Sequence, residues 1–538
     1  MPEASSKTDG SRLKPSTQST FVAHTVFWGL LSGGLSAILW VLSMPPFECA
    51  EAAYLAFVPL ILWLYTQPSR RLCLAVALST AWTAWFAILI WLRHVTLFGT
   101  IALSGMLAVI FMLWVMLVHC ILPLVATRSF VWRALGFASL AGAWVVLEWS
   151  RTWLLWGFPW APLSLSQWQR PVVLQIAAWT GAYGISFLLI YFNCCIAQTV
   201  RNRVLGAKHR LWTGWFSLDL YLALTLLGGC VWIFFKSLPV GGSAISLCTA
   251  AVVQPYIKPE VKWDEAKELE NLHILEQQTR RVANLESDLV LWPEAASPWP
   301  VKGSPQMQAR VEALVDEIAK PILMGNLAVD PGTDRWYNGA FLVAPATGLA
   351  ADYYIKRELV PFGEFVPKPF AFIDKVVPVG GNFVPGIKPG LIDLNIHDHS
   401  LQIGSLVCYE DIFPNLARDS ARAGAQIFFV ATNNAWYGEE GGASQHAAHS
   451  VLRAVENRRP VMRCGNGGWS GWIDAYGTVR EVLRDADGSI YFRGGGCYTV
   501  VHFKQWMQSH SIYTQYGDWF VAVCGLLALV GIAMRWIL

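Results

Sequence analysis

Apolar segments long enough to cross a membrane dominate the first part of this chain and return at its end. A helix needs about 20 mainly apolar residues to span about 30 Å of hydrocarbon. Segments of this kind lie at residues 24–44, 50–66, 72–92, 98–126, 132–149, 174–198, 217–235 and 519–538. The first is too long for a signal peptide and lacks a small-residue cleavage pattern, so we expect it to be retained. The pattern predicts a multi-span membrane domain of about eight α-helices.

Between the seventh and eighth of these segments, the pattern changes to short β-rich runs that alternate with amphipathic helical stretches. Strands are predicted at 244–253, 288–292, 321–325, 352–355, 401–408, 426–432 and 460–464, and helices at 265–284, 306–320, 415–423 and 445–458. This alternation is typical of a layered α/β domain, in which loops at the carboxyl ends of strands carry the chemistry. The predicted parts are an N-terminal tail (1–22), a membrane domain with seven helices (23–236), an extramembrane α/β domain (237–510) and a C-terminal transmembrane helix (519–538).

Basic residues are distributed unevenly between the predicted spans, and cytoplasmic loops of membrane proteins carry the excess of Lys and Arg. Connections on one side hold 11 of them: Lys7, Arg12, Lys14, Arg70, Arg71, Arg128, Arg133, Arg201, Arg203, Lys208 and Arg210. Connections on the other side hold only Arg93, Arg151 and Arg170. The N-terminal tail is therefore predicted to be cytoplasmic. The α/β domain is then outside the cytoplasm, which is the periplasm in a bacterium with two membranes.

The composition supports a membrane protein and excludes several classes of function. Of the 538 residues, 54% are hydrophobic and only 14% are charged, unlike an average soluble protein. The net charge of +3, without a basic stripe, argues against binding of nucleic acid. The 11 cysteines form no CxxC pair, so neither a zinc site nor a disulfide scaffold is predicted. No metal-ligand cluster and no phosphate-binding glycine loop follows a strand, so no cofactor is expected.

Three residues with reactive side chains stand at the carboxyl ends of predicted strands. Glu294 follows the strand that ends at Trp292, Lys356 follows 352–355, and Cys408 ends 401–408. Each alone is more often structural, because strand-end cysteines usually pack as small apolar residues and Glu and Lys are usually solvated. Together they form a known constellation, in which a carboxylate, an ammonium and a thiol follow one another along the chain, each at the carboxyl end of a strand.

In this order, the three residues resemble the Glu–Lys–Cys triad of the nitrilase superfamily. The flanking membrane segments make the chain similar to one branch in particular, the bacterial apolipoprotein N-acyltransferases. Other stretches similar to that family are Phe158-Pro159-Trp160, Lys262-Trp263, Tyr337-Asn338, Pro361–Pro367, Phe383–Gly386, Asn433–Gly438 and Gln445-His446. Two features depart from it: Asn434 stands where Asp is more usual, and residues 464–469 are unusually rich in glycine.

The resemblance implies an αββα-sandwich of the nitrilase type and an acyltransferase of the bacterial inner membrane. Cys408 is the implied nucleophile, Glu294 the base and Lys356 the cation beside the oxyanion, with a further oxyanion donor from the backbone after Cys408. Supporting or substrate-binding roles are implied for Glu364, Tyr409, Glu410, Trp263 and Asn338. The implied partners are a phospholipid acyl donor, membrane lipid and a diacylated lipoprotein, whose N-terminal diacylglyceryl-cysteine supplies the accepting amine. A monomer is expected.

Two other functions and several local alternatives stay open. A membrane-tethered amidase would use the same three residues with water as acceptor, and a transporter or scaffold would have a catalytically inactive extramembrane domain. Glu148 and Arg151 are either an interfacial ion pair with an extended arginine or a site for a lipid headgroup. Trp263 is either a packing residue or a wall of an acyl-chain entrance, and His446 is more typical of a core or capping residue than of a participant.

Overall fold

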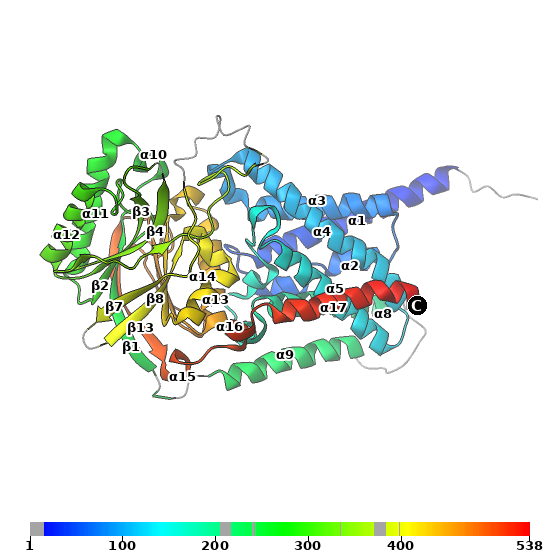
Figure 1. Ribbon diagram of the computed structural model, residues 1–538. Helices are drawn as coiled ribbons and strands as arrows, with labels where there is room; N and C mark the ends of the chain where they lie inside the picture. Colours follow the sequence, from blue (N-terminus) through cyan, green and yellow to red (C-terminus); the bar gives the residue numbers. More distant parts are fainter. Residues whose placement is uncertain are drawn as a thin grey trace, which may run out of the picture.

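The structure is a computed structural model that describes residues 15–204, 217–238, 241–242, 244–333, 335–368, 370, 383–396 and 399–537. Most of the predicted N-terminal tail lies outside the described residues, as do Lys208 and Arg210. A group of long helices lies beside an α/β sandwich (Figure 1), which confirms the predicted fold class.

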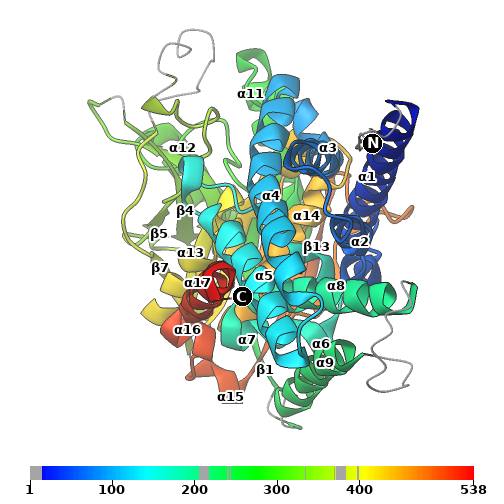
Figure 2. The same ribbon diagram turned by 90° about the vertical axis from the view of Figure 1, so that its right-hand side faces the viewer.

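Seven helices in the described part of the chain are long and apolar enough to cross a membrane. These candidate spans correspond to α1 (Pro15–Ser43), α3 (Arg70–Ile88), α4 (Leu97–Val125), α5 (Phe130–Ser150), α8 (Tyr183–Val204), α9 (Leu218–Lys236) and α17 (Trp519–Ile537). Viewed from the membrane-domain end, α4 and α5 run through the centre of the group, with α1 and α3 on one side and α17 on the other (Figure 2).

The second predicted span differs from a regular transmembrane helix. It consists of a 3-10 turn, Ala50–Tyr54, and a helix of only seven residues, α2 (Val58–Leu64). The irregular backbone is satisfied internally, because Asn193 accepts a hydrogen bond from Phe57 N at 2.7 Å and donates one to Ala53 O at 2.9 Å. Buried side chains of this kind allow non-helical backbone at membrane depth.

The chain nevertheless returns across the helical domain at α2. Pro45, just after α1, accepts a hydrogen bond from Gln445 of the α/β domain. Tyr65, just after α2, instead donates to Gln198 near the far end of α8. Helices α1 and α3 therefore both run toward the α/β domain, and the segment between them supplies the return that the sequence predicts. The sixth predicted span also shifts: α6 (Pro171–Leu174) and α7 (Ala177–Thr180) precede Gly181, whose φ of +69° interrupts the helix before α8.

The sandwich contains two sheets with parallel strands at their centres. The first sheet has the order β13 (Gly494–Phe503), β1 (Ala244–Gln254), β2 (Leu289–Trp292), β3 (Ile322–Val329), β4 (Trp336–Ala344) and β5 (Gly348–Leu349), and β6 (Tyr354–Ile355) also pairs with β4. The second has the order β12 (Val479–Val482), β11 (Gly471–Ile473), β10 (Val461–Gly465), β9 (Ile427–Thr432), β8 (His399–Val407) and β7 (Leu391–Ile396). The helices of this domain are α10 (Pro259–Lys262), α11 (Glu268–Ala283), α12 (Pro305–Ile318), α13 (Pro414–Ala423), α14 (Gly442–Asn457), α15 (Lys504–Met507) and α16 (Ile512–Tyr516).

Two helical layers cover the sandwich, and one of them faces the membrane helices. Helices α11 and α12 cover the outer face of the first sheet, whereas α13 and α14 lie between the second sheet and the helical domain (Figure 1). One continuous apolar core includes membrane-helix residues such as Trp114 together with Val451 and Leu452 of α14. The α/β domain is therefore packed onto the membrane domain, with α14 at the junction.

Several of the observed strands were not predicted from the sequence, and β13 shows the reason. It begins with three glycines, which have low strand propensity. A Cβ at Gly495 would lie 2.3 Å from Val282 Cγ1 and 2.6 Å from Val252 O. Glycine therefore permits the close pairing of β13 with β1, which joins the end of the domain to its beginning.

Candidate active site

The structure brings Glu294, Lys356 and Cys408 together from three separate strand ends. Glu294 follows β2, Lys356 follows β6, and Cys408 follows β8. Lys356 Nζ lies 3.5 Å from Glu294 Oε1, and the Glu294 carboxylate and the Cys408 thiol are near enough to shift each other's pKa. Each of the three residues is less than 10% exposed, so their interactions take place away from bulk water.

Glu364 and Asn338 complete the immediate surroundings of Lys356. Glu364 Oε1 accepts hydrogen bonds from Lys356 Nζ at 2.9 Å and from Asn338 Nδ2 at 3.0 Å. Asn338 Nδ2 also donates to Glu294 Oε1 at 2.9 Å. Glu364 Oε2 is held by Val360 N at 2.8 Å, which fixes the second carboxylate. The Lys356 ammonium therefore lies close to two carboxylates, and the Asn338 amide is hydrogen-bonded to both of them.

The charges of the group follow from burial and from these contacts. Burial alone would raise the pKa of Glu294, but the Lys356 charge, the nearby Cys408 thiol and the hydrogen bond from Asn338 leave it below its ordinary value. Burial lowers the pKa of Lys356, yet Glu364 and Glu294 outweigh it and the net pKa is raised. Burial and the Glu294 charge raise the pKa of Cys408 to about 12. At neutral pH, Glu294 is thus a carboxylate, Lys356 an ammonium and Cys408 a neutral thiol.

Cys408 occupies a strained backbone conformation that its neighbours stabilise. Its φ is +52°, a left-handed value that costs a non-glycine residue about 1–3 kcal/mol. Thr432 Oγ1 donates a hydrogen bond to Cys408 Sγ at 3.6 Å, and the backbone N–H of Asn433 favours the thiolate and so lowers the pKa of this thiol. Asn466 Nδ2 donates a hydrogen bond to Asn433 Oδ1 at 2.9 Å, so the glycine-rich loop 464–469 contacts a residue that is itself a neighbour of the thiol.

Glu410 and Tyr409, both predicted as supports, hold the nucleophile loop in different ways. Glu410 Oε2 accepts from Val407 N at 2.7 Å, and its Oε1 accepts from Tyr354 OH at 2.7 Å and Arg357 N at 2.6 Å. It therefore ties the residue before Cys408 to the segment around Lys356. Burial raises the pKa of Glu410 to about 7. Tyr409 OH donates to Gly157 O at 2.6 Å and thus connects the nucleophile loop to the membrane domain.

Lys262 is a neighbour of the site that sequence reasoning did not single out. Its ammonium is buried and donates to the backbone carbonyl of Glu294 at 3.0 Å. Burial lowers the pKa of Lys262 to about 8. The adjacent Trp263 is 49% exposed, so it is not a core packing residue, and its ring lies 5.8 Å from Lys262 Nζ. The sequence does contain an indication of this residue, because Lys262-Trp263 is one of the stretches similar to the family, but a role was predicted only for Trp263.

His446 is a buried part of the site and not a helix cap. Its Nδ1 lies 2.8 Å from Asn434 Oδ1, and its Nε2 lies 3.0 Å from Cys408 O and 2.7 Å from Asp411 Oδ1. The Asp411 carboxylate also pairs with Arg463. Asn434, where the family more usually has Asp, therefore contacts the nucleophile through this imidazole. No group of three or more His, Cys, Asp or Glu side chains among the described residues could hold a metal ion.

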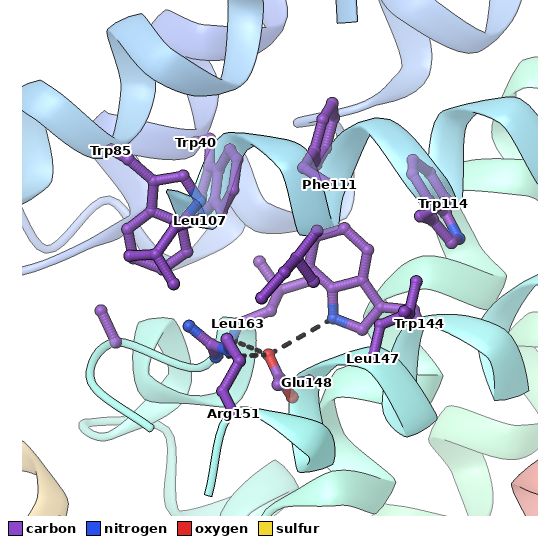
Figure 3. Close-up of a pocket in the computed structure, with 12 residues that line it drawn as sticks. Trp40, Trp85, Leu107, Phe111, Trp114, Trp144, Leu147, Glu148, Arg151 and Leu163 are labelled. Atoms are coloured by element: carbon purple, nitrogen blue, oxygen red, sulfur yellow. Dashed lines mark hydrogen bonds and ion pairs between the residues drawn. The ribbon is translucent and has the colours of Figure 1, made fainter. Parts of the chain in front are cut away.

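A small pocket lies inside the helical domain, near the face that packs against the α/β domain (Figure 3). Aromatic side chains line it: Trp40, Trp85, Phe111, Trp114 and Trp144. Glu148 and Arg151 border both this pocket and a second small one that reaches α14. Glu148 Oε1 accepts from Leu163 N at 2.7 Å, and Arg151 donates to Trp160 O at 3.1 Å. Both side chains are buried, so Arg151 does not extend to a membrane surface; a lipid-headgroup role stays a prediction.

Comparisons with known proteins agree with both parts of the chain. Residues 36–195 match the family model of the apolipoprotein N-acyltransferase N-terminal domain, and residues 249–495 match that of carbon-nitrogen hydrolases. An apolipoprotein N-acyltransferase from Geobacter metallireducens is 32% identical over 93% of this chain and 94% of the relative. One from Brucella melitensis is 28% identical over 86% of this chain and 88% of the relative. Among solved structures, an amidase from Nesterenkonia sp. AN1 matches 53% of this chain and 99% of its own, at 18% identity and a TM-score of 0.37.

Proposed function

Since this chain belongs to the apolipoprotein N-acyltransferase family, we propose that it transfers a fatty acyl chain from a phospholipid to the α-amino group of a lipoprotein's N-terminal diacylglyceryl-cysteine. The observation that carries this proposal is the meeting of the buried Cys408 thiol, the Glu294 carboxylate and the Lys356 ammonium at three strand ends. A nucleophile, a base and a cation within contact distance are the parts required for covalent acyl transfer. The packing of the α/β domain against membrane helices supports this proposal, because both proposed substrates are anchored in lipid.

In the first half-reaction, Cys408 Sγ attacks the ester carbonyl of the phospholipid while Glu294 takes the thiol proton. The thiol has a raised pKa and the carboxylate a lowered one, so the proton moves as the carbon–sulfur bond forms and not before. Lys356, together with the backbone N–H of Tyr409, stabilises the oxyanion. The intermediate then expels the lysophospholipid alkoxide, which takes the proton from Glu294, and a thioester remains on Cys408.

In the second half-reaction, the acceptor amine attacks the thioester carbonyl and Glu294 accepts an amine proton. The carbon–sulfur bond breaks, the leaving thiolate is protonated by Glu294, and an amide is formed. Glu364 and Asn338 keep Lys356 and Glu294 in position through both steps. Glu410 and Tyr409 hold the nucleophile loop, and Trp263 forms an outer wall of the acyl-chain entrance.

An amine acceptor separates this function from the amidase alternative, in which water attacks the same thioester. Purified enzyme should first be loaded with a phospholipid and then given a diacylated lipopeptide with a free α-amine. We expect mass spectrometry to show the N-acylated peptide, while the same peptide with a blocked amine stays unchanged. Rapid hydrolysis of the thioester in the absence of any amine would contradict the proposed acyltransferase function and favour a hydrolase.

We also propose that the α/β domain faces the periplasm of the bacterial inner membrane, since basic residues favour the opposite side of the helices. Alkaline phosphatase fused after residue 240 should then be active, because this enzyme matures outside the cytoplasm. Fusion near Arg203 should give an inactive reporter. The reverse pattern of activities would contradict the orientation and would remove access to a periplasmic lipoprotein.

A further inference from the structure

Gln445, in the first turn of α14, connects the α/β domain to three separate segments of the membrane domain. Its Oε1 accepts hydrogen bonds from Trp91 Nε1 at 2.9 Å and Trp160 Nε1 at 2.8 Å. Its Nε2 donates to Pro45 O at 2.9 Å and to Ile88 O at 3.0 Å. Both lone pairs and both N–H groups of the amide are therefore used, at a residue that is 2% exposed.

The next residue, His446, contacts the candidate nucleophile. Its Nε2 lies between Cys408 O and the Asp411 carboxylate, and a carbonyl oxygen only accepts hydrogen bonds. Nε2 therefore carries a proton and donates it to Cys408 O, while the Asp411 carboxylate lies nearby. The ring of Trp160 packs against His446 with centroids 5.5 Å apart, so the indole that binds Gln445 also limits the position of the imidazole.

The hydrogen bond to Cys408 O bears on catalysis through the geometry of one peptide. A trans peptide is planar, and its C=O and N–H point in opposite directions. Holding the Cys408 carbonyl on the side of His446 therefore directs the Tyr409 N–H to the other side. That N–H is the backbone donor assigned above to the oxyanion. The left-handed φ of Cys408 makes this peptide dependent on outside contacts.

We propose that Gln445 is a positioning residue, which couples the seating of α14 on the membrane helices to the orientation of the Cys408–Tyr409 peptide through His446. This inference rests on the proposed oxyanion role of that peptide. It does not require the acyl donor to be a phospholipid. The reactivity of the site toward esters thus depends on contacts with Pro45, Ile88, Trp91 and Trp160, all of them in the membrane domain.

The test compares two reactions of Cys408 in the full-length enzyme, purified in detergent. Acylation by p-nitrophenyl butyrate passes through an oxyanion, whereas alkylation by iodoacetamide is a direct displacement without one. Gln445→Met should slow the acylation on the order of 10- to 100-fold, as expected for a misplaced catalytic group, and leave the alkylation rate unchanged. The loss should be in the maximal rate, with the half-saturating ester concentration unchanged.

Gln175 offers a matched control at the other end of α14. It is fully buried, donates to Tyr476 O at 3.0 Å and accepts from Arg458 Nη1 at 2.6 Å, so it also joins the two domains. Gln175→Met should lower the thermal unfolding temperature about as much as Gln445→Met but leave ester acylation at the wild-type rate. Trp160→Phe, which keeps a ring beside His446 but removes one donor to Gln445, should give a smaller loss.

A double-mutant cycle completes the test. If Gln445 acts through His446, combining Gln445→Met with His446→Asn should slow acylation little more than His446→Asn alone. Equal losses in acylation and alkylation, additive effects of the two substitutions, or an unchanged acylation rate would overturn the proposal. The test measures acylation of Cys408 by a soluble ester. If the wild-type enzyme reacted with this ester but not with phospholipids, that result would contradict the proposed function and not the role of Gln445.

Discussion

Cys408→Ala is expected to abolish thioester formation completely, which is the largest effect that any substitution in this chain should have. Purified wild-type enzyme given phospholipid without an amine should accumulate an acyl adduct, because the buried site slows hydrolysis. The adduct should map to Cys408 by peptide mass spectrometry and should be cleaved by neutral hydroxylamine, which is specific to a thioester. Adduct formation at another of the 11 cysteines would remove Cys408 from its assigned role.

Glu294→Gln extends this experiment to the base. Glutamine keeps the shape and the hydrogen bond with Asn338 but cannot take the thiol proton. Loss of a general base typically costs about 10²–10⁴ in rate, so the same adduct should form at Cys408, only far more slowly. Wild-type rates in this variant would show that the thiol loses its proton to another group.

Lys356→Met is expected to lower the acylation rate by about 10²–10³, the usual effect of removing one donor to an oxyanion. Methionine has about the length of lysine but no charge. Glu364 and Glu294 would then lie close together without the cation between them. A single-turnover measurement isolates the step, because it does not depend on release of the lysophospholipid.

Lys320 provides the control for this substitution. Its ammonium donates to Ala283 O at 2.9 Å, Leu285 O at 2.7 Å and Ser287 Oγ at 3.0 Å, so it is also a lysine tied down by several hydrogen bonds. Lys320→Met should affect stability but not single-turnover acylation. Near-normal acylation in Lys356→Met would show that its ammonium does not stabilise the oxyanion.

Local properties of the sequence were sufficient to predict the class of protein and to select three candidate residues that the structure brings together. The need for about 20 apolar residues to cross a bilayer identified the membrane helices, because this requirement acts on each segment separately. Glu294, Lys356 and Cys408 could be selected because each lies within two residues of the end of a strand, and strand ends can be located from local patterns. Resemblance then supplied Glu364, Asn338 and Glu410, whose contacts no local pattern reveals.

Only the tertiary structure decided the features that depend on residues far apart in the chain. The amide of Asn193 stabilises an irregular second crossing where the apolar pattern predicts a plain helix. Lys262 reaches the carbonyl of Glu294, and Gln445 reaches Pro45 and Trp91 across more than 350 residues. A polar residue in a helix has the same local sequence whether it faces water or a buried partner, so its role is decided by the packing of the two domains against each other.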